Sequence, residues 1–155
     1  TGDAGYLDDN NRLFITDRIK ELMKTSNGKY IAPQHVEGMI GRDAWIDQIA
    51  IVAAGRNFVS ALIVPNFEAI EAWAIEKKIK VSNHKKLIKH IDVIVQFNQR
   101  LKGLQEELAN YEKVKKFTLL PYAFSIDKGE MTPTLKLRRK VITQHFETTI
   151  EAMYK

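Results

Sequence analysis

The pattern of apolar and polar positions predicts a pair of core strands in the middle of the chain and a further strand later on. Residues 46–55 read IDQIAIVAAG and residues 58–66 read FVSALIVPN, two runs rich in β-branched apolar residues around a short Gly-Arg-Asn turn. Such runs are typical of paired core strands. Residues 114–121, VKKFTLLP, predict a further strand.

The first thirty residues contain only short apolar stretches and are rich in residues that form turns. Residues 5–18, GYLDDNNRLFITDR, predict two short strands around an Asp-Asp-Asn-Asn turn, because small polar side chains bond their own backbone there. Residues 20–33, KELMKTSNGKYIAP, predict a second hairpin with its turn at Ser26-Asn27-Gly28. An Asn-Gly pair adopts positive φ at low cost, which suits such a turn.

Four stretches carry apolar residues at spacings of three and four, the pattern of amphipathic helices. Pro33 suits the first turn of one helix, Gly41 ends it, and Asn66 is a suitable N-cap for the next. The other two cover residues 84–109 and 138–154. The residues predicted to face the core are Val36, Met39, Ile40, Leu87, Ile91, Ile94, Phe97, Leu101, Leu104, Leu108, Ile142, Phe146, Ile150 and Met153. Strands and helices intermingle, so we predict an α+β fold: a small leading β-hairpin region followed by a compact sheet packed with helices.

Composition narrows the class of protein. The chain has 155 residues, 45% of them apolar and 28% charged, as in an ordinary soluble globular domain. A net charge of +5 favours anionic partners. Without cysteine there is no disulfide and no thiol nucleophile, which agrees with a cytoplasmic protein. No apolar run approaches the roughly 20 residues of a membrane span. The start is acidic and lacks Met, so we expect a piece of a longer protein.

Several kinds of site have no support in the sequence. The histidines show no HExxH or other tight ligand spacing, so we predict no metal site. There is no GxSxG elbow and no Walker loop. One stretch is strongly cationic, through Lys77, Lys78, Lys80, Lys85, Lys86 and Lys89. It lacks interleaved aromatic residues, so we interpret it as a solvated face and expect no nucleic-acid partner.

Three polar islands remain: Thr1-Gly2-Asp3, the segment 17–21 (DRIKE), and the loop around Lys136 in GEMTPTLKLRRKVI. Taken singly they are typical of a turn, a structural salt bridge and a surface lysine. A carboxylate such as Asp3 can accept both hydroxyls of a ribose, and Arg18 can complete that site with its planar fork. Lys136 can bring a compact mobile ammonium to an oxyanion.

In this order, TGD, DRIKELMKTSNGKYIAPQHVE and GEMTPTLKLRRKVI closely resemble the C-terminal motifs of the adenylate-forming acyl-CoA synthetases. The segment TPTLKL and the helical insert at 66–111 are similar to those of the long-chain fatty acid branch of this family. The resemblance implies that residues 20–155 are a mobile C-terminal lid domain. Residues 1–19 would be the end of the linker, with the ribose-binding motif. A larger N-terminal domain would carry the phosphate loop and the acyl tunnel, and the isolated fragment would be inactive.

The resemblance also implies a reaction and residue roles. ATP and a fatty acid give acyl-AMP and pyrophosphate, and CoA then displaces AMP, with Mg²⁺ bound mainly by the N-terminal domain. By motif, Asp3 and Arg18 match the nucleotide-binding residues and Lys20 the hinge. Lys136 matches the lysine of adenylate formation, and Gly28 lies in the loop that lines the CoA channel. The basic neighbours of Lys136, residues 138–140, are expected to matter much less.

Two other readings remain open at this point. The chain could belong to an acyl-AMP ligase that loads a carrier protein, or it could be a stand-alone basic module for nucleotides or anionic membrane. Peripheral membrane contact of the full-length cytoplasmic protein is a further expectation. The length of the native polypeptide separates the enzyme from the module, because the enzyme needs several hundred residues.

Overall fold

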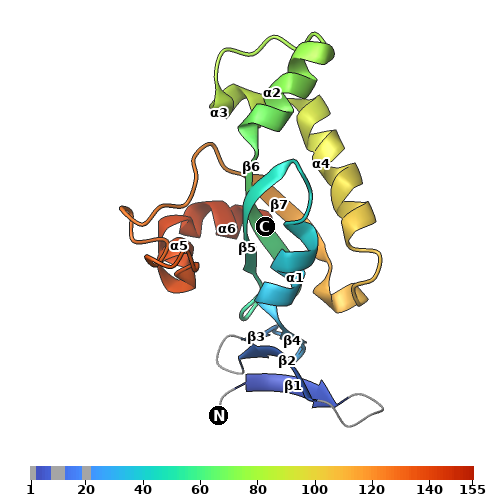
Figure 1. Cartoon of the computed structure of the whole chain (residues 1–155), viewed down its shortest axis with the longest axis vertical. Helices are drawn as coiled ribbons and strands as arrows, with labels where there is room; N and C mark the ends of the chain where they lie inside the picture. Colours follow the sequence, from blue (N-terminus) through green and yellow to red (C-terminus); the bar gives the residue numbers. More distant parts are fainter. Residues whose placement is uncertain (1–2, 8–12, 19–21) are drawn as a thin grey trace.

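The computed structural model describes residues 3–7, 13–18 and 22–155 of the chain (Figure 1). Two small hairpins come first. Strand β1 (Asp3–Leu7) pairs antiparallel with β2 (Leu13–Arg18), and β3 (Met23–Lys24) pairs antiparallel with β4 (Tyr30–Ile31). Both predicted hairpins are confirmed. The Asp-Asp-Asn-Asn turn of the first lies outside the described residues.

A three-stranded sheet forms the centre of the domain, in the order β5 (Ile46–Val52), β6 (Val59–Pro65), β7 (Val114–Leu119). The pair β5–β6 is antiparallel, as the short turn between them predicts, and β7 runs parallel to β6. A parallel pair needs a crossover connection, which is the helical segment between β6 and β7. The two predicted core strands and the further predicted strand are therefore confirmed.

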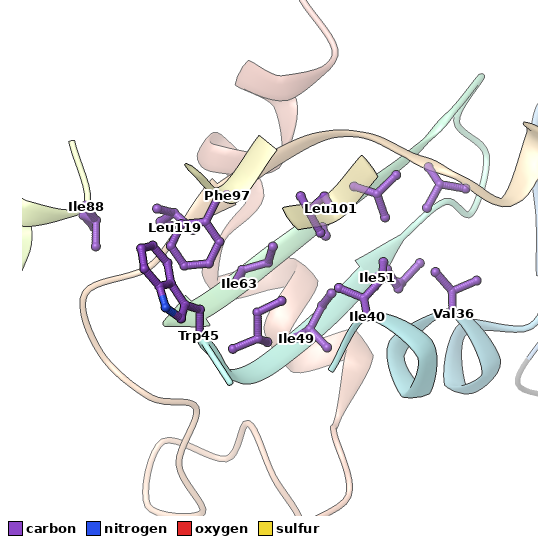
Figure 2. Packing of buried hydrophobic residues seen from close by; sticks show 14 of the residues in the cluster. Val36, Ile40, Trp45, Ile49, Ile51, Ile63, Ile88, Phe97, Leu101 and Leu119 are labelled. Atoms are coloured by element: carbon purple, nitrogen blue, oxygen red, sulfur yellow. The ribbon is translucent and has the colours of Figure 1, made fainter. Parts of the chain in front are cut away.

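Both faces of this sheet are buried, because strand residues alternate between two hydrophobic clusters. Helices α1 (Pro33–Ile40), α2 (Phe67–Glu76) and α4 (Ile91–Leu104) contribute to the larger cluster. Its centre includes Ile49, Ile51, Ile63, Phe97 and Leu101 (Figure 2). Helices α5 (Arg139–His145) and α6 (Glu147–Met153) pack on the opposite face, against Ala50, Val52, Leu62 and Val64. The predicted helix that begins at Pro33 is confirmed. The helix capped by Asn66 is confirmed as well, because Asn66 Oδ1 accepts a hydrogen bond from Ala69 N.

The single helix predicted over residues 84–109 is wrong. The segment contains a short α3 (His84–Leu87), a break, and then α4, which ends at Leu104. The break lies at His90, whose extended backbone places its ring Nδ1 to accept from Asp92 N at 3.2 Å. The side chain therefore acts as an N-cap, and the helix must start again. As a result Val93 is buried, whereas Ile91, predicted in the core, is 66% exposed.

The predicted closing helix over 138–154 is also divided, into α5 and α6. The two meet at Phe146, whose φ of −111° and ψ of 22° are not helical. There the Phe146 ring packs edge-on against Phe124, with 5.9 Å between ring centroids. Ile142, Ile150 and Met153 are buried as predicted. Within the described ranges, no helix has the length and apolarity to cross a bilayer.

Side chains cover the outer edge of β5, which has a strand partner on one side only. The Glu37 carboxylate of α1 accepts a hydrogen bond from Ile51 N at 2.9 Å. Further along the edge, Gln48 Oε1 accepts from Phe124 N at 2.7 Å. An uncovered strand edge would leave backbone groups such as Ile51 N unpaired or open to other chains. The edge therefore anchors both α1 and the long segment that carries Lys136.

Candidate functional site

Lys136 lies in the returning arm of a small hairpin, three residues before α5 begins. Met131 and Leu137 form an antiparallel bridge at its base, and Thr132 N donates to Lys136 O at 2.8 Å. Lys136 N donates back to Thr132 Oγ1 at 3.1 Å. The side chain is exposed, and among the described residues its ammonium has no hydrogen-bond or ion-pair partner. The hairpin thus fixes the backbone of Lys136 and leaves its charge free for a ligand.

The turn of this hairpin has an unusual conformation. Leu135 N donates to Thr132 O at 2.8 Å, and Leu135 has a φ of +64°. The loop is therefore a three-residue turn, Pro133-Thr134-Leu135, whose last residue is left-handed, a position normally given to glycine. A leucine there costs about 1–2 kcal/mol. Strained backbone of this kind clusters at ligand-binding and active sites, which agrees with a role for the adjacent Lys136.

A buried carboxylate holds the base of the Lys136 hairpin in place. The Glu130 side chain is only 3% exposed. One oxygen accepts from Ser125 N at 3.3 Å, and the other lies 2.9 Å from His145 Nδ1 in α5. The Glu130 carbonyl oxygen accepts from Arg138 N at 2.8 Å. One residue therefore joins the start of the loop, its return arm and the following helix.

The helix after the hairpin is fixed to the other side of the domain. Arg139 donates to both oxygens of Glu37, at 2.6 and 2.7 Å, in a bidentate pair that bridges α5 and α1. Both side chains are largely buried. The structure changes the expectation for Arg139, which is not an idle neighbour of Lys136. Arg138 and Lys140 are exposed, as expected.

Gly28 lies in a hairpin with the same construction as the Lys136 hairpin. Thr25 N donates to Lys29 O at 2.8 Å, and Lys29 N donates to Thr25 Oγ1 at 3.1 Å. Gly28, the last residue of the three-residue loop, has a φ of +81°. Each hairpin thus places a threonine before the loop, a left-handed residue at its end and a lysine immediately after it. The two lie on different parts of the domain, since β3 and β4 are distant from the orange segment leading to α5 in Figure 1.

A hollow of about 250 Å³ opens beside the Gly28 hairpin. The hairpin is docked there by Ser26 N, which donates to Arg56 O at 2.8 Å, and by the Asn27 amide, which donates to Asn57 O at 3.3 Å. The Lys29 ammonium lies 5.4 Å from the centre of the Tyr111 ring. The lining residues are Thr25, Asn27, Lys29, Asn57, Phe58, Asn110, Tyr111 and Lys115. Amides, ammonium groups and aromatic rings without a carboxylate suit a planar, phosphorylated ligand.

The last helix, α6, and Tyr154 directly after it contact the turn that borders this hollow. Tyr154 donates to Phe58 O at 2.8 Å, and its burial raises the pKa of the hydroxyl above the ordinary value. The Arg56 guanidinium lies 4.7 Å from the Tyr154 ring centre and pairs with Glu151. The hydrogen bond from Arg56 lowers the pKa of Glu151 below its ordinary value. The turn between β5 and β6 is therefore held by the last helix.

The nucleotide-binding candidates lie at one end of the first hairpin. Asp3 and Arg18 are directly opposite each other in the β1–β2 register. The backbone thus brings together two residues that are fifteen positions apart in the sequence. Lys20, the predicted hinge, lies outside the described residues. In the part of the chain that the structure describes, no three His, Asp or Glu residues lie close enough to hold a metal ion.

Residues 20–155 match the family of AMP-binding enzyme C-terminal domains. The chain belongs to this family. It is 35% identical to a long-chain-fatty-acid–CoA ligase of Mycobacterium tuberculosis, FadD15, over 99% of this chain and 26% of the relative. Human long-chain-fatty-acid–CoA ligase 1 is 34% identical over 99% of this chain and 22% of its own length. The chain therefore spans about a quarter of the length of these relatives.

Solved structures of related enzymes share the fold. The adenylation domain of a carboxylate reductase from Mycobacterium chelonae matches 99% of this chain and 22% of its own length, with a TM-score of 0.78 and 24% identity. A fatty acyl CoA synthetase of Mycobacterium tuberculosis matches 96% of this chain and 24% of its own length, with a TM-score of 0.57 and 21% identity. The predicted α+β lid fold is confirmed.

Proposed function

We propose that this chain is the C-terminal lid of a long-chain fatty acid–CoA ligase. The whole enzyme activates a fatty acid with ATP to acyl-AMP and pyrophosphate, and then transfers the acyl group to CoA with release of AMP. The observation that carries the proposal is the 35% identity to a long-chain-fatty-acid–CoA ligase over 99% of the chain. The missing three quarters of such a ligase would be the partner domain, with the phosphate loop and the acyl tunnel.

Within the chain, we propose that residues 1–19 end the linker and that 20–155 form the moving domain. The start of the family match at residue 20 supports this division. The Mg²⁺ of the ATP complex would be bound by the partner domain, since the described residues offer no acidic cluster for it. Asp3 and Arg18, opposite each other across the hairpin, would hold the nucleotide.

Lys136 would serve the first half-reaction. Attack of the fatty acid carboxylate on the α-phosphate gathers negative charge on the carboxylate, the phosphate and the departing pyrophosphate. An ammonium placed there lowers the barrier, provided that it is fixed in advance. The exposed Lys136 on a constrained hairpin supplies such a group. Rotation of the lid would then remove the charge before the thiol enters.

The Gly28 hairpin would serve the second half-reaction. With no Cβ at Gly28, the backbone can approach a narrow chain such as the pantetheine arm of CoA. The hollow beside it, with Lys29, Lys115 and the Tyr111 ring, is suited to the phosphorylated nucleotide end of CoA. The separation of the two hairpins in the fold supports their use in different lid positions.

The direct test of this function is product analysis with the full-length protein. Incubation with ATP, Mg²⁺, CoA and palmitate should yield palmitoyl-CoA, AMP and pyrophosphate. If acyl-AMP forms but is transferred only to a carrier protein, the acceptor assignment to CoA is wrong. A native polypeptide that consists of these 155 residues alone would favour the stand-alone binding module instead.

Asp3→Ala in the full-length enzyme should impair both half-reactions, because ATP and acyl-AMP share the same ribose. A carboxylate that accepts hydrogen bonds from two hydroxyls contributes about 2–4 kcal/mol. Isothermal titration of AMP should therefore show weaker binding by a factor on the order of 100. Asp9→Ala, in the segment of the sequence between β1 and β2, is the matched control. Unchanged AMP affinity in Asp3→Ala would reduce Asp3 to a turn residue.

Lys20→Pro should arrest the lid in one position, because proline fixes the backbone φ and removes a donor at the proposed hinge. We expect adenylate formation to survive better than thioester formation, measured as separate half-reactions. Lys20→Ala is the control, since it keeps the backbone free. Equal loss of both half-reactions with an unchanged circular dichroism spectrum would contradict the hinge assignment, whereas a changed spectrum would attribute the loss to misfolding.

A further inference from the structure

The cationic stretch of the sequence forms one end of the molecule. Residues 75–91, the basic tip, cover the end of α2, the loop after it, α3 and the start of α4. In Figure 1 this end lies at the top, opposite the N-terminal hairpins. The tip has six lysines and one glutamate, and its charge of +5 equals the net charge of the whole chain. The rest of the chain therefore sums to zero, and the charge imbalance is local.

The lysines of the basic tip are available to a partner. All six are exposed, and among the described residues no carboxylate lies within ion-pair distance of any of them. The nearby carboxylate of Glu71 is instead 2.6 Å from His84 Nε2. Lys78 has a φ of +59°, so the chain reverses sharply within the lysine-rich loop. Within the described part of the chain, none of these six charges is neutralised by an ion pair, although the Lys85 ammonium lies over the Tyr122 ring.

Apolar groups are exposed among these lysines. Ile75 is 78% exposed, the largest value among the exposed large hydrophobic residues of the described part, and Ile91 is 66% exposed, as is Leu135 elsewhere in the domain. Ile75 also borders a hollow of about 220 Å³ between α2 and the following loop. Its apolar lining residues are Ala74, Ile75, Ile79, Val81 and Leu87. Large aliphatic side chains next to unpaired ammonium groups form an amphiphilic surface.

We propose that the basic tip binds the surface of membranes that contain anionic lipids. Each lysine near such a surface is attracted by the negative headgroups, and exposed isoleucines gain by entering the interface. Aliphatic side chains favour a lipid over a nucleic acid, whose bases stack on aromatic rings. The exposed Tyr122, 5.7 Å from the Lys85 ammonium, is also typical of the membrane interface. The surface would work independently of the reaction proposed above.

The test is co-sedimentation of the full-length protein with vesicles, without ATP or CoA. Vesicles of phosphatidylcholine with phosphatidylglycerol should bind the protein, phosphatidylcholine alone should bind it weakly, and added salt should release it. Replacement of Lys77, Lys78 and Lys80 by Gln should lower the partition coefficient on the order of 100-fold. Ile75→Ser should lower it about 10-fold. The matched control, with the same loss of charge elsewhere, replaces Lys102, Lys113 and Lys155 by Gln and should bind nearly as the wild type does.

Two results would overturn the proposal. The first is equal vesicle binding by the wild type and the tip variant, or an equal loss in the control variant, which would show a mere net-charge effect. The second is tighter binding of a duplex oligonucleotide than of anionic vesicles through the same three lysines. Circular dichroism of each variant excludes misfolding as the cause. Because the assay needs no catalysis, its outcome does not depend on whether the ligase assignment holds.

Discussion

Lys136→Ala in the full-length enzyme is expected to slow adenylate formation on the order of 100- to 1000-fold, the usual effect of removing one preorganised charge contact. Thioester formation from pre-made acyl-AMP should remain largely intact, because in the proposed second lid position the Gly28 hairpin would replace Lys136. The fold should not change, since the Lys136 ammonium has no partner among the described residues. Lys136→Arg should rescue only in part, because a planar fork replaces a compact ammonium.

The two half-reactions must be measured separately, by pyrophosphate release from ATP and by CoA-dependent consumption of acyl-AMP. Lys140→Ala is the matched control, because Lys140 is also exposed and lies in the first turn of α5. It should retain most of both activities. If Lys136→Ala slows both half-reactions equally, or if Lys140→Ala has the same effect, this lysine is not the adenylation residue.

Arg139→Ala should have the opposite profile, with a large effect on stability and little effect on the balance between the half-reactions. It leaves the largely buried Glu37 carboxylate without its bidentate partner, although Ile51 N still donates to it. Loss of one member of such a pair lowers the free energy of unfolding by about 2–4 kcal/mol. The affected contact joins α1, the edge of β5 and α5, so the cost falls on the whole domain.

Urea denaturation of the 155-residue chain measures this effect. The isolated chain has its own sheet and two hydrophobic clusters, so it should unfold as a unit. Arg138→Ala is the control, since Arg138 is exposed, and its midpoint should stay close to that of the wild type. A wild-type midpoint for Arg139→Ala would contradict the structural role of the pair. A selective loss of adenylate formation in that variant would give Arg139 a chemical role instead.

Much of the fold could be predicted because its signals are local. Strands β5 and β6 are covered on both faces of the sheet. Most of their positions must therefore be apolar, and this produces the long β-branched runs in the sequence. Asn27-Gly28 and Asn66 act through their own backbone conformation and hydrogen bonds, so a few residues suffice to predict a turn or a cap. These elements needed no knowledge of their tertiary partners.

The breaks in the helices could not be predicted in the same way. The apolar spacing continues through His90 and Phe146, so periodicity alone predicts unbroken helices. What interrupts them is a histidine ring used as a cap in one case and packing against Phe124 in the other. Both depend on contacts that the pattern of apolar residues does not contain.

The motifs of the candidate site could be recognised in the sequence. The residues that hold these motifs in place could not. The Asn27-Gly28 pair predicts a left-handed residue at Gly28, whereas nothing in the sequence predicts that Leu135 adopts the same conformation. Glu37 and Glu130 look like ordinary surface acids in the sequence, yet Glu130 is buried, Glu37 is largely buried, and both hold the Lys136 segment in place. Their partners are 102 and 15 residues away, and only the fold brings them together.

The most direct test of the central claim, that Lys136 belongs to the lid of a fatty acid–activating enzyme, is ATP–pyrophosphate exchange by the full-length protein with a panel of carboxylic acids. We expect exchange that depends on a long-chain fatty acid and is nearly abolished in Lys136→Ala. Exchange that requires a different class of acid, or fatty acid-dependent exchange that survives in Lys136→Ala, would contradict it.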